Sequence, residues 1–317
     1  MAARPYAINS TNVRNLMALT WERLALAVTT TLSPRLAVER AARLFATPPR
    51  IAHTQKEVEL LQTGRGFVVP FGFTRLAAWR FGAEDHPAIV FSHGWGGRGA
   101  QFRAFVPPLL EAGYQVVLFD HEGHGHSEGH EASLVHFLKG LEGVVSHLEQ
   151  AGITVAGLVG HSLGAAAVAA WLNQTRRPMR TVLIAPPTSI KRWSDYFARR
   201  LGLPESIRRA MQERLEERLG RRWKEFELPG SVAHVAGEAL VIHDEQDHEV
   251  PFTSGLALAR AWRGAHMVRT RGLGHRALLR DPGVVQDTLD FIVDRTVFPR
   301  PLAYGEASSF RSPAPIA

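Results

Sequence analysis

The sequence predicts an α/β fold in which a mainly parallel central sheet is flanked by helices. Between residues 88 and 298 short apolar runs alternate with longer segments of helical periodicity, as expected when helical crossovers join parallel strands. Runs such as Val116–Phe119 are continuously apolar, which is typical of strands buried on both faces. The chain of 317 residues, 45% hydrophobic and 21% charged, is long enough to bury a large core.

The predicted elements begin with an antiparallel portion and continue with the α/β alternation. Three strands are expected first, at Glu57–Leu61, Gly66–Pro70 and Arg75–Phe81. The later strands are predicted at Ala88–Ser92, Gln115–Asp120, Thr154–Gly160, Arg180–Ala185, Ala239–His243 and His266–Thr270. The intervening helices are predicted at Gln101–Ala112, Ser133–Gln150, Ser162–Asn173, Thr253–Trp262 and Gly283–Val297.

An interruption of the alternation predicts an inserted segment. Between Pro187 and Gly237 only one helix is predicted, Pro204–Leu219, with Ile207, Met211 and Leu215 on one face and Gly220 as its stop. We therefore predict an α/β core at residues 57–187 and 237–298, with a small helical lid inserted at residues 188–236. Residues 299–317, rich in Pro, Ser and Ala, are predicted to form a flexible tail.

Residues 1–56 are predicted to form an N-terminal helical arm. Its first helix carries an apolar stripe. A second helix is expected to start at Ser33-Pro34 and to run through Phe45. The arm is expected to pack on the body, with a peripheral membrane contact or a homodimer contact as the alternatives, because basic residues flank an apolar stripe. Helical spacing places on that stripe Val13, Met17, Trp21, Leu24 and Val28.

The positive charge of the chain is local. The net charge is +7 and the isoelectric point is about 10.3. Residues 1–50 hold seven arginines and two glutamates, and residues 188–235 hold eleven Lys or Arg against seven Asp or Glu. Because the rest of the chain is close to neutral and carries no familiar nucleic-acid motif, no nucleic-acid partner is expected.

The absence of cysteine excludes several classes of chemistry. With no cysteine in the sequence, structural disulfides, Cys-ligated zinc, iron–sulfur clusters and thiol nucleophiles are ruled out. No run approaches the roughly 20 apolar residues of a membrane span, and no secretory signal is convincing. We expect a cytoplasmic protein, with peripheral membrane association as the alternative.

The feature most informative about chemistry is Gly160-His161-Ser162-Leu163-Gly164, which lies between a predicted strand and an alanine-rich helix. A Gly-x-Ser-x-Gly sequence in this context forms a sharp strand-to-helix turn that exposes the serine Oγ above the sheet. The adjacent helix N-terminus favours developing negative charge. Ser162 is therefore the candidate nucleophile.

A base and an acid follow Ser162 in the chain. A serine hydroxyl is a weak nucleophile at neutral pH and requires a histidine base, which in turn requires an acid that orients it. The acidic loop Asp244–Pro251 follows one predicted strand, and Gly272–His275 follows the next. The residues predict His275 as the base and leave three candidate acids, Asp244, Glu245 and Asp247.

Four segments together resemble the α/β-hydrolase superfamily and span about residues 57–298: His93–Gly96, Asp120–Ser127, the Ser162 turn, and the loops carrying Asp247 and His275. The order Ser, Asp, His is that of the superfamily. In the superfamily the acid stands four residues after a histidine, here His243, which selects Asp247. The glycine usual after that histidine is Asp244 here, so Asp244 and Glu245 remain alternatives.

The resemblance also implies an oxyanion hole. The backbone N–H groups of Trp95 and Leu163 would hold the oxyanion of a tetrahedral intermediate, and each such donor contributes roughly 10²–10³ in rate. The Trp95 indole is expected to wall the pocket. No cofactor or metal is expected. The histidine cluster His121, His124, His126 and His130 is a weak zinc candidate, since no acidic or Cys pattern completes it and it lies in a loop typical of the superfamily.

These observations predict a serine hydrolase that cleaves a carboxylic ester with a medium-chain or lipid-like acyl group; the apolar face of the lid suggests this acyl group. Thioester, amide, lactone and C–C bond hydrolysis and perhydrolysis use the same triad and remain alternatives. Haloalkane dehalogenase and epoxide hydrolase mechanisms of the usual type are excluded, because they require a carboxylate in place of Ser162. A non-catalytic ligand-binding protein and a membrane-associated lipase are the other hypotheses.

Overall fold

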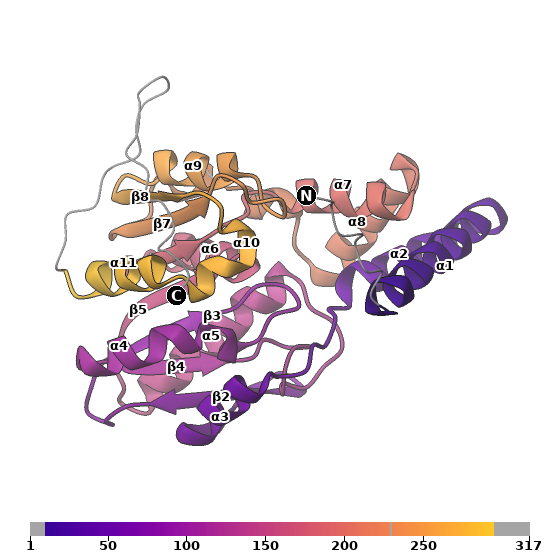
Figure 1. Cartoon of the computed structure of the whole chain (residues 1–317). Coiled ribbons are helices and arrows are strands. Elements are labelled where there is room, and N and C mark those ends of the chain that lie inside the picture. The colour runs from indigo at the N-terminus through magenta and orange to yellow at the C-terminus, as the bar shows by residue number, and fades with distance from the viewer. Residues whose placement is uncertain (1–9, 229, 295–317) are drawn as a thin grey trace, which may run out of the picture. The chain divides into compact units, whose positions relative to one another are not determined.

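The computed structural model describes residues 10–228 and 230–294, with side chains described from residue 19 onward. The chain divides into two compact units (Figure 1). The α/β unit comprises Thr47–Ser189 with Phe226–Ala317, and the helical unit comprises Met1–Ala46 with Ile190–Glu225. The predicted tail at residues 299–317 and the side chains of Val13 and Met17 lie outside the described part.

An eight-stranded sheet forms the centre of the α/β unit, with the order β1-β2-β4-β3-β5-β6-β7-β8. β1 pairs antiparallel with β2, and β2 with β4, whereas every other neighbouring pair is parallel. The mainly parallel sheet with an antiparallel start is therefore confirmed. The strands are Arg65–Phe71 (β1), Thr74–Phe81 (β2), Ala88–Ser92 (β3), Gln115–Phe119 (β4), Val155–His161 (β5), Arg180–Ile184 (β6), Ala239–Asp244 (β7) and Ala265–Thr270 (β8).

Helices cover both faces of this sheet (Figure 1). One face shares a core with α3 (Gln55–Thr63), the 3₁₀ helix η1 (Gly99–Phe105), α4 (Val106–Glu111) and α11 (Pro282–Ile292). The other face is covered by α5 (Leu134–Gln150), α6 (Leu163–Thr175) and α9 (Phe252–Ala261). Burial on both faces explains why β3, β4 and β7 have no exposed residue.

Three of the predicted elements are wrong in type or extent. The segment Glu57–Leu61 belongs to helix α3, because Glu57 Oε2 accepts a 2.7 Å hydrogen bond from the N–H of Thr54 and caps the helix start. The helix predicted at Gln101–Ala112 is split into η1 and α4, and α4 begins where two prolines occupy its first turn. Helix α11 ends at Ile292 rather than continuing to residue 297.

The helical unit contains α1 (Ser10–Leu32), α2 (Pro34–Ala46), α7 (Ile190–Leu201) and α8 (Glu205–Leu219). Helix α7 was not predicted. The small residues Ala37, Ala41 and Ala42 of α2 are buried beside α8, so the two helices pack closely. The apolar face of α8, formed by Ile207, Met211 and Leu215, is at most 4% exposed within this unit. The N-terminal arm and the insertion thus share one core.

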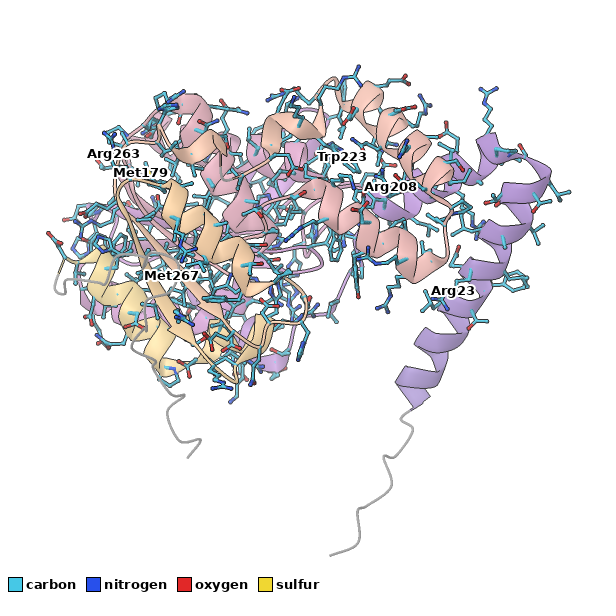
Figure 2. All side chains as sticks on the ribbon, turned by 90° about the horizontal axis from the view of Figure 1, so that it is seen from above. Arg23, Met179, Arg208, Trp223, Arg263 and Met267 are labelled. Atoms are coloured by element: carbon cyan, nitrogen blue, oxygen red, sulfur yellow. The ribbon has the colours of Figure 1, made fainter. Side chains whose placement is uncertain are left out.

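Polar contacts also connect the helices of this unit. The buried Arg208 of α8 (Figure 2) lies 3.2 Å from Asp195 of α7 and donates a 3.1 Å hydrogen bond to Ser194 Oγ. Arg23 of α1 donates a 2.8 Å hydrogen bond to the Arg200 carbonyl. Among residues 10–228 and 230–294, no helix is both long enough and apolar enough to span a bilayer.

Candidate active site

The candidate catalytic residues lie in loops at one edge of the sheet. Trp95 follows β3, Ser162 follows β5 and Asp247 follows β7. His275 follows β8 and lies in the short helix α10 (Gly274–Ala277). Because β3, β5, β7 and β8 all belong to the parallel part of the sheet, their carboxyl ends point to the same edge. This edge is where open α/β sheets bind their ligands.

Ser162 occupies a strained turn between β5 and α6. Its φ of 53° and ψ of −124° lie in a region that residues with a side chain rarely adopt. Its N–H donates a 2.9 Å hydrogen bond to the Ile184 carbonyl of β6, which fixes the turn to the sheet. The turn places Ser162 at the N-terminus of α6, where the helix dipole favours negative charge.

Glycines make this turn sterically feasible. A Cβ on Gly164 would lie 2.1 Å from the Ser92 carbonyl oxygen, and one on Gly160 would lie 2.5 Å from the Ala165 Cα. Gly94 has a similar role, since a Cβ there would lie 2.8 Å from the Cβ of Ser162. The loop after β3 and the Ser162 turn are therefore in close backbone contact.

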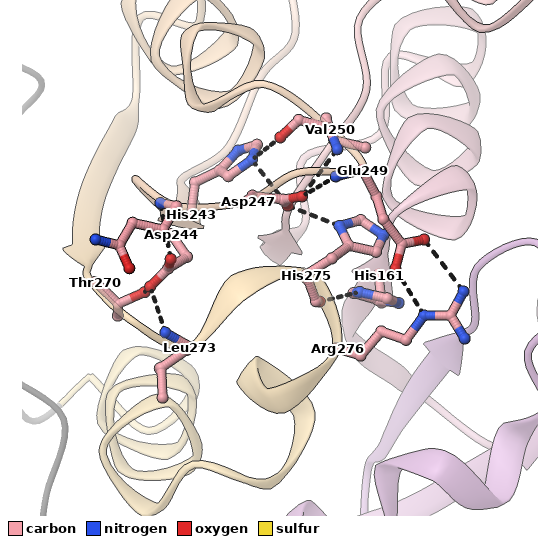
Figure 3. Close-up of polar contacts among 11 residues, drawn as sticks. His161, His243, Asp244, Asp247, Glu249, Val250, Thr270, Leu273, His275 and Arg276 are labelled. Atoms are coloured by element: carbon pink, nitrogen blue, oxygen red, sulfur yellow. Dashed lines mark hydrogen bonds and ion pairs between the residues drawn. The ribbon is translucent and has the colours of Figure 1, made fainter. Parts of the chain in front are cut away.

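His275 is hydrogen bonded to Asp247. The His275 Nδ1–H donates to Asp247 Oδ2 at 2.7 Å (Figure 3). The side chain of Asp247 is fully buried, and that of His275 is 6% exposed. The other oxygen, Asp247 Oδ1, accepts 2.8 Å hydrogen bonds from the N–H groups of Glu249 and Val250. A carboxylate held at both oxygens fixes the imidazole in one orientation.

A second histidine contacts the same carboxylate. His243 Nε2–H donates to the Val250 carbonyl at 3.0 Å and lies 3.3 Å from Asp247 Oδ2 (Figure 3). Burial would raise the pKa of Asp247, but the hydrogen bonds from His243 and His275 outweigh it, and the pKa lies below its ordinary value. Asp247 is therefore ionised at neutral pH. The sequence indicated His243 only as a landmark for locating the acid.

The two alternative acids have other partners. Asp244 accepts hydrogen bonds from Thr270 Oγ1 at 2.8 Å and from the Leu273 N–H at 3.0 Å, so it holds the loop that leads to His275. Glu245 is paired with Arg269. Of the three candidate acids, Asp247 is therefore the one hydrogen bonded to the imidazole of His275.

His161, next to Ser162, links the turn to His275. Its Nε2–H donates a 3.0 Å hydrogen bond to the His275 carbonyl, and the two rings lie 4.7 Å apart. Burial lowers the pKa of His161 well below its ordinary value, so it stays neutral. No role for His161 beyond its place in the motif was predicted from the sequence. This contact holds the Ser162 turn against the loop that carries His275.

The loop carrying Trp95 is a tight turn with a free amide. The Gly97 N–H donates to the Gly94 carbonyl at 2.9 Å, and the Gly96 N–H donates to His124 Nε2 at 3.0 Å. Within the part of the chain that is described, the Trp95 N–H has no hydrogen-bond acceptor. Leu163 is the first residue of α6, so its N–H has no intrahelical acceptor either.

Three histidines behind this turn have structural partners. His93 Nε2 accepts a 2.9 Å hydrogen bond from the His121 N–H, and His121 Nε2 is hydrogen bonded to Ser92 Oγ at 2.8 Å. Burial lowers the pKa of His93 and His121, and it lowers that of His124 to about 3. These imidazoles are neutral packing and hydrogen-bonding groups. Of the cluster indicated by the sequence, His126 and His130 are the exposed members.

The fold and this site define the protein as an α/β-hydrolase. Residues 83–250, just over half of the chain, match the family described as serine aminopeptidase, S33. The chain therefore belongs to this family, and the superfamily indicated by the sequence motifs is confirmed. Family membership leaves the substrate open, since one fold supports many reactions.

Similar proteins have diverse activities. Epoxide hydrolase B of Mycobacterium tuberculosis is 37% identical over 96 residues, which cover 29% of this chain and 27% of that protein. The non-heme chloroperoxidase of Burkholderia pyrrocinia is 28% identical over 143 residues, which cover 42% of this chain and 50% of that protein. The chain thus spans at most half the length of these relatives.

A solved structure shares the fold over most of its length. The esterase Pf2001 of Pyrococcus furiosus superposes with a TM-score of 0.59 and 18% identity, covering 77% of this chain and 98% of the esterase.

Proposed function

We propose that this protein is a serine hydrolase that cleaves carboxylic esters through an acyl-enzyme, with Ser162 as nucleophile, His275 as base and Asp247 as acid. The observation that carries the proposal is the buried 2.7 Å hydrogen bond between His275 and Asp247, next to a strained serine turn. A histidine held by an ionised carboxylate is the group that a serine hydroxyl needs for activation.

The reaction uses groups of the chain alone. Ser162 Oγ attacks the ester carbonyl while its proton passes to His275 Nε2, and the carbonyl oxygen becomes an oxyanion bound by the N–H groups of Trp95 and Leu163. The alcohol leaves with the proton from His275 Nε2. Water then transfers a proton to His275 and attacks the acyl group, which releases the acid and restores Ser162.

Two observations bear on the competing reactions. The chloroperoxidase relative favours perhydrolysis as the second candidate, in which hydrogen peroxide replaces water as the acceptor of the same acyl group. The epoxide hydrolase relative is a weaker guide, because the usual mechanism of that activity needs a carboxylate where this chain has Ser162.

The apolar face of the inserted helix, from which the acyl preference was predicted, is not available to a substrate. The apolar face of α8 that predicted a medium-chain or lipid-like acyl group is packed inside the helical unit. We propose the same acyl class as a working expectation, and p-nitrophenyl esters from acetate to palmitate test it by the chain length that gives the highest kcat/KM.

The experiment that tests the proposed roles compares ester hydrolysis by the wild type, Asp247→Asn and Glu249→Gln. Loss of the charge on Asp247 is expected to lower kcat by about 10³–10⁴-fold, as for other triads whose acid is made neutral. Glu249 is the matched control, since it lies in the same loop but pairs with Arg276. Equal activity of Asp247→Asn and the wild type would contradict the triad. A folded wild type that hydrolyses no ester would favour the ligand-binding alternative.

A further inference from the structure

Three side chains outside the proposed triad form a cluster of metal-ligand type. One ligand atom each of His53, Asp120 and His126 lies within 4.8 Å of the others. His53 lies in the segment between α2 and α3, whereas Asp120 and His126 belong to the loop after β4. Asp120 is fully buried and the side chain of His126 is 54% exposed. The cluster therefore has one buried carboxylate and an open side that faces water.

The spacing within the cluster is close to that of two ligands of one cation. His126 Nδ1 lies 3.7 Å from Asp120 Oδ2, which is too long for a hydrogen bond. Two ligands of a tetrahedral zinc ion, each about 2.05 Å from the metal, are separated by about 3.3 Å. A shift of a few tenths of an ångström would bring these two atoms to that separation.

An unpartnered nitrogen supports a ligand at this place. His53 Nε2 is buried and has no hydrogen-bond partner, although buried polar atoms are almost always paired. Asp120 Oδ1 accepts a 2.7 Å hydrogen bond from the Gly99 N–H, and Oδ2 accepts a 2.8 Å hydrogen bond from the His126 N–H. Each carboxylate oxygen retains a second lone pair, so both hydrogen bonds can persist when a metal binds.

The segment that carries His53 is held against the β4 loop. Arg50 donates hydrogen bonds to three carbonyl groups of that loop, those of Gly125 at 2.9 Å, Ser127 at 2.9 Å and Gly129 at 2.7 Å. The ring of His53 lies 4.4 Å from that of His126. The ligands are thus brought together by other contacts, which lowers the entropy lost when a cation binds.

We propose that His53, Asp120 and His126 bind a divalent transition-metal cation of the zinc type, with water in the remaining position. Two imidazoles and one carboxylate suit zinc and similar metals, whereas magnesium prefers oxygen ligands alone. The bound cation would join the segment before α3 to the loop after β4. The residues differ from those of the proposed triad, so this is a second site.

The test measures metal binding by the full chain. Wild type, His53→Gln, His126→Gln and His130→Gln are stripped with a chelator and dialysed against zinc, cobalt or magnesium, and metal content is measured together with the visible spectrum of the cobalt form. His130 is the matched control because it is an exposed histidine of the same loop.

We expect one zinc or cobalt ion per wild-type chain and no magnesium. The His53 and His126 variants should each bind zinc more than about tenfold more weakly, since even partners outside the ligand shell contribute about 10–100-fold. His130→Gln should match the wild type. Zinc binding to His53→Gln and His126→Gln as tight as to the wild type, or no binding by the wild type, would overturn the proposal.

A second inference concerns the helical unit and rests on different observations. The unit holds seventeen Lys or Arg residues against eight Asp or Glu, a net charge of +9, so the α/β unit carries −2 of the total of +7. On one face of α1, Trp21, Leu24, Val28 and Leu32 recur at helical spacing and are 67%, 57%, 47% and 79% exposed. Leu36 of α2 is 61% exposed.

We infer that this face of α1 binds an anionic lipid surface. A helix that presents an apolar face with a large aromatic residue beside basic side chains is typical of helices that lie in the membrane interface. The exposed Arg35 of α2 is next in sequence to the exposed Leu36, and each basic residue near an anionic leaflet adds about 1 kcal/mol of attraction. The charge of the unit selects an anionic lipid surface over a second copy of the chain, because two units of +9 repel each other.

Vesicle sedimentation of the full chain tests this inference. Vesicles of phosphatidylcholine with 30% phosphatidylglycerol are compared with pure phosphatidylcholine for the wild type, Leu24→Gln/Leu32→Gln and Phe73→Gln. Phe73, fully exposed on the α/β unit, is the control.

The double variant should bind anionic vesicles at least about tenfold more weakly, and Phe73→Gln should bind as the wild type does. Binding of the double variant equal to that of the wild type would overturn the inference. So would a wild-type dimer that this variant dissociates, since the face would then be a self-interface.

Discussion

Replacement of Ser162 by glycine is expected to stabilise the protein while it abolishes the proposed activity. The φ of 53° and ψ of −124° at this residue are strained for serine and accessible to glycine. Within the described residues the Ser162 side chain makes no hydrogen bond whose loss would offset the gain. The substitution therefore removes strain without leaving a buried partner unpaired.

The size of the effect follows from two opposing contributions. Relief of a sparsely populated backbone conformation is worth about 1–3 kcal/mol, and the larger entropy of glycine in the unfolded chain offsets about 0.4–1 kcal/mol. We expect a net gain of about 1–2 kcal/mol in the free energy of unfolding, which for a protein of this size is about 1.5–3 °C in Tm.

Ser162→Ala is the matched control, because it removes the hydroxyl but keeps the Cβ that causes the strain. The assay is calorimetric or urea unfolding of the wild type and both variants at pH 7. Ser162→Gly should be more stable than Ser162→Ala. Equal stability of the two variants, or lower stability of the glycine variant, would refute the idea that the turn stores strain.

Three further predictions concern stability. Gly164→Ala should destabilise the fold by about 3 kcal/mol or more in urea unfolding, since its Cβ would lie 2.1 Å from the Ser92 carbonyl oxygen. Gly143→Ala is the control and should be neutral or stabilising, because no atom lies closer than 3.9 Å to its Cβ. Arg98→Met should cost about 3–5 kcal/mol because it leaves Glu57 buried and unpaired, and a rescue by Arg98→Met/Glu57→Gln is expected; a neutral single variant would contradict this. Burial lowers the pKa of His124 to about 3 in the folded protein, against about 6.5 in the unfolded chain. Its contribution to the free energy of unfolding is therefore complete above pH 6.5, and about 2 kcal/mol of that free energy is lost when the pH falls to 5. His124→Gln should flatten this pH dependence, and an unchanged urea midpoint profile would contradict it.

The sequence predicted the architecture of the α/β unit well, because local signals and burial agree there. Alternating apolar runs located the parallel strands, and the Ser162 motif lay between a strand and a helix as predicted. The error at α3 has a specific cause. Val58, Leu60 and Leu61 look like a short strand, but the side chain of Glu57 caps a helix start and also pairs with Arg98, a residue 41 positions away.

Contacts between distant segments could not be predicted from the sequence. Helix α2 ends more than 140 residues before α7 begins, and the helical periodicity of neither segment shows that Ala37 and Ala41 share a core with Met211. His53 gave no signal, because its approach to Asp120 depends on Arg50 and on the path of the chain before α3. Among the candidate acids, spacing from His243 favoured Asp247, whereas only coordinates show which carboxylate contacts His275.

The central claim is that Ser162 is a nucleophile activated by His275 and Asp247. Its most direct test is to treat the wild type, Ser162→Ala and His275→Ala with a fluorophosphonate probe and to locate the adduct by peptide mass spectrometry. The account predicts stoichiometric labelling of the wild type on Ser162, slow or no labelling of His275→Ala, and none of Ser162→Ala. A folded wild type that stays unlabelled, or one labelled at a different serine, would contradict it.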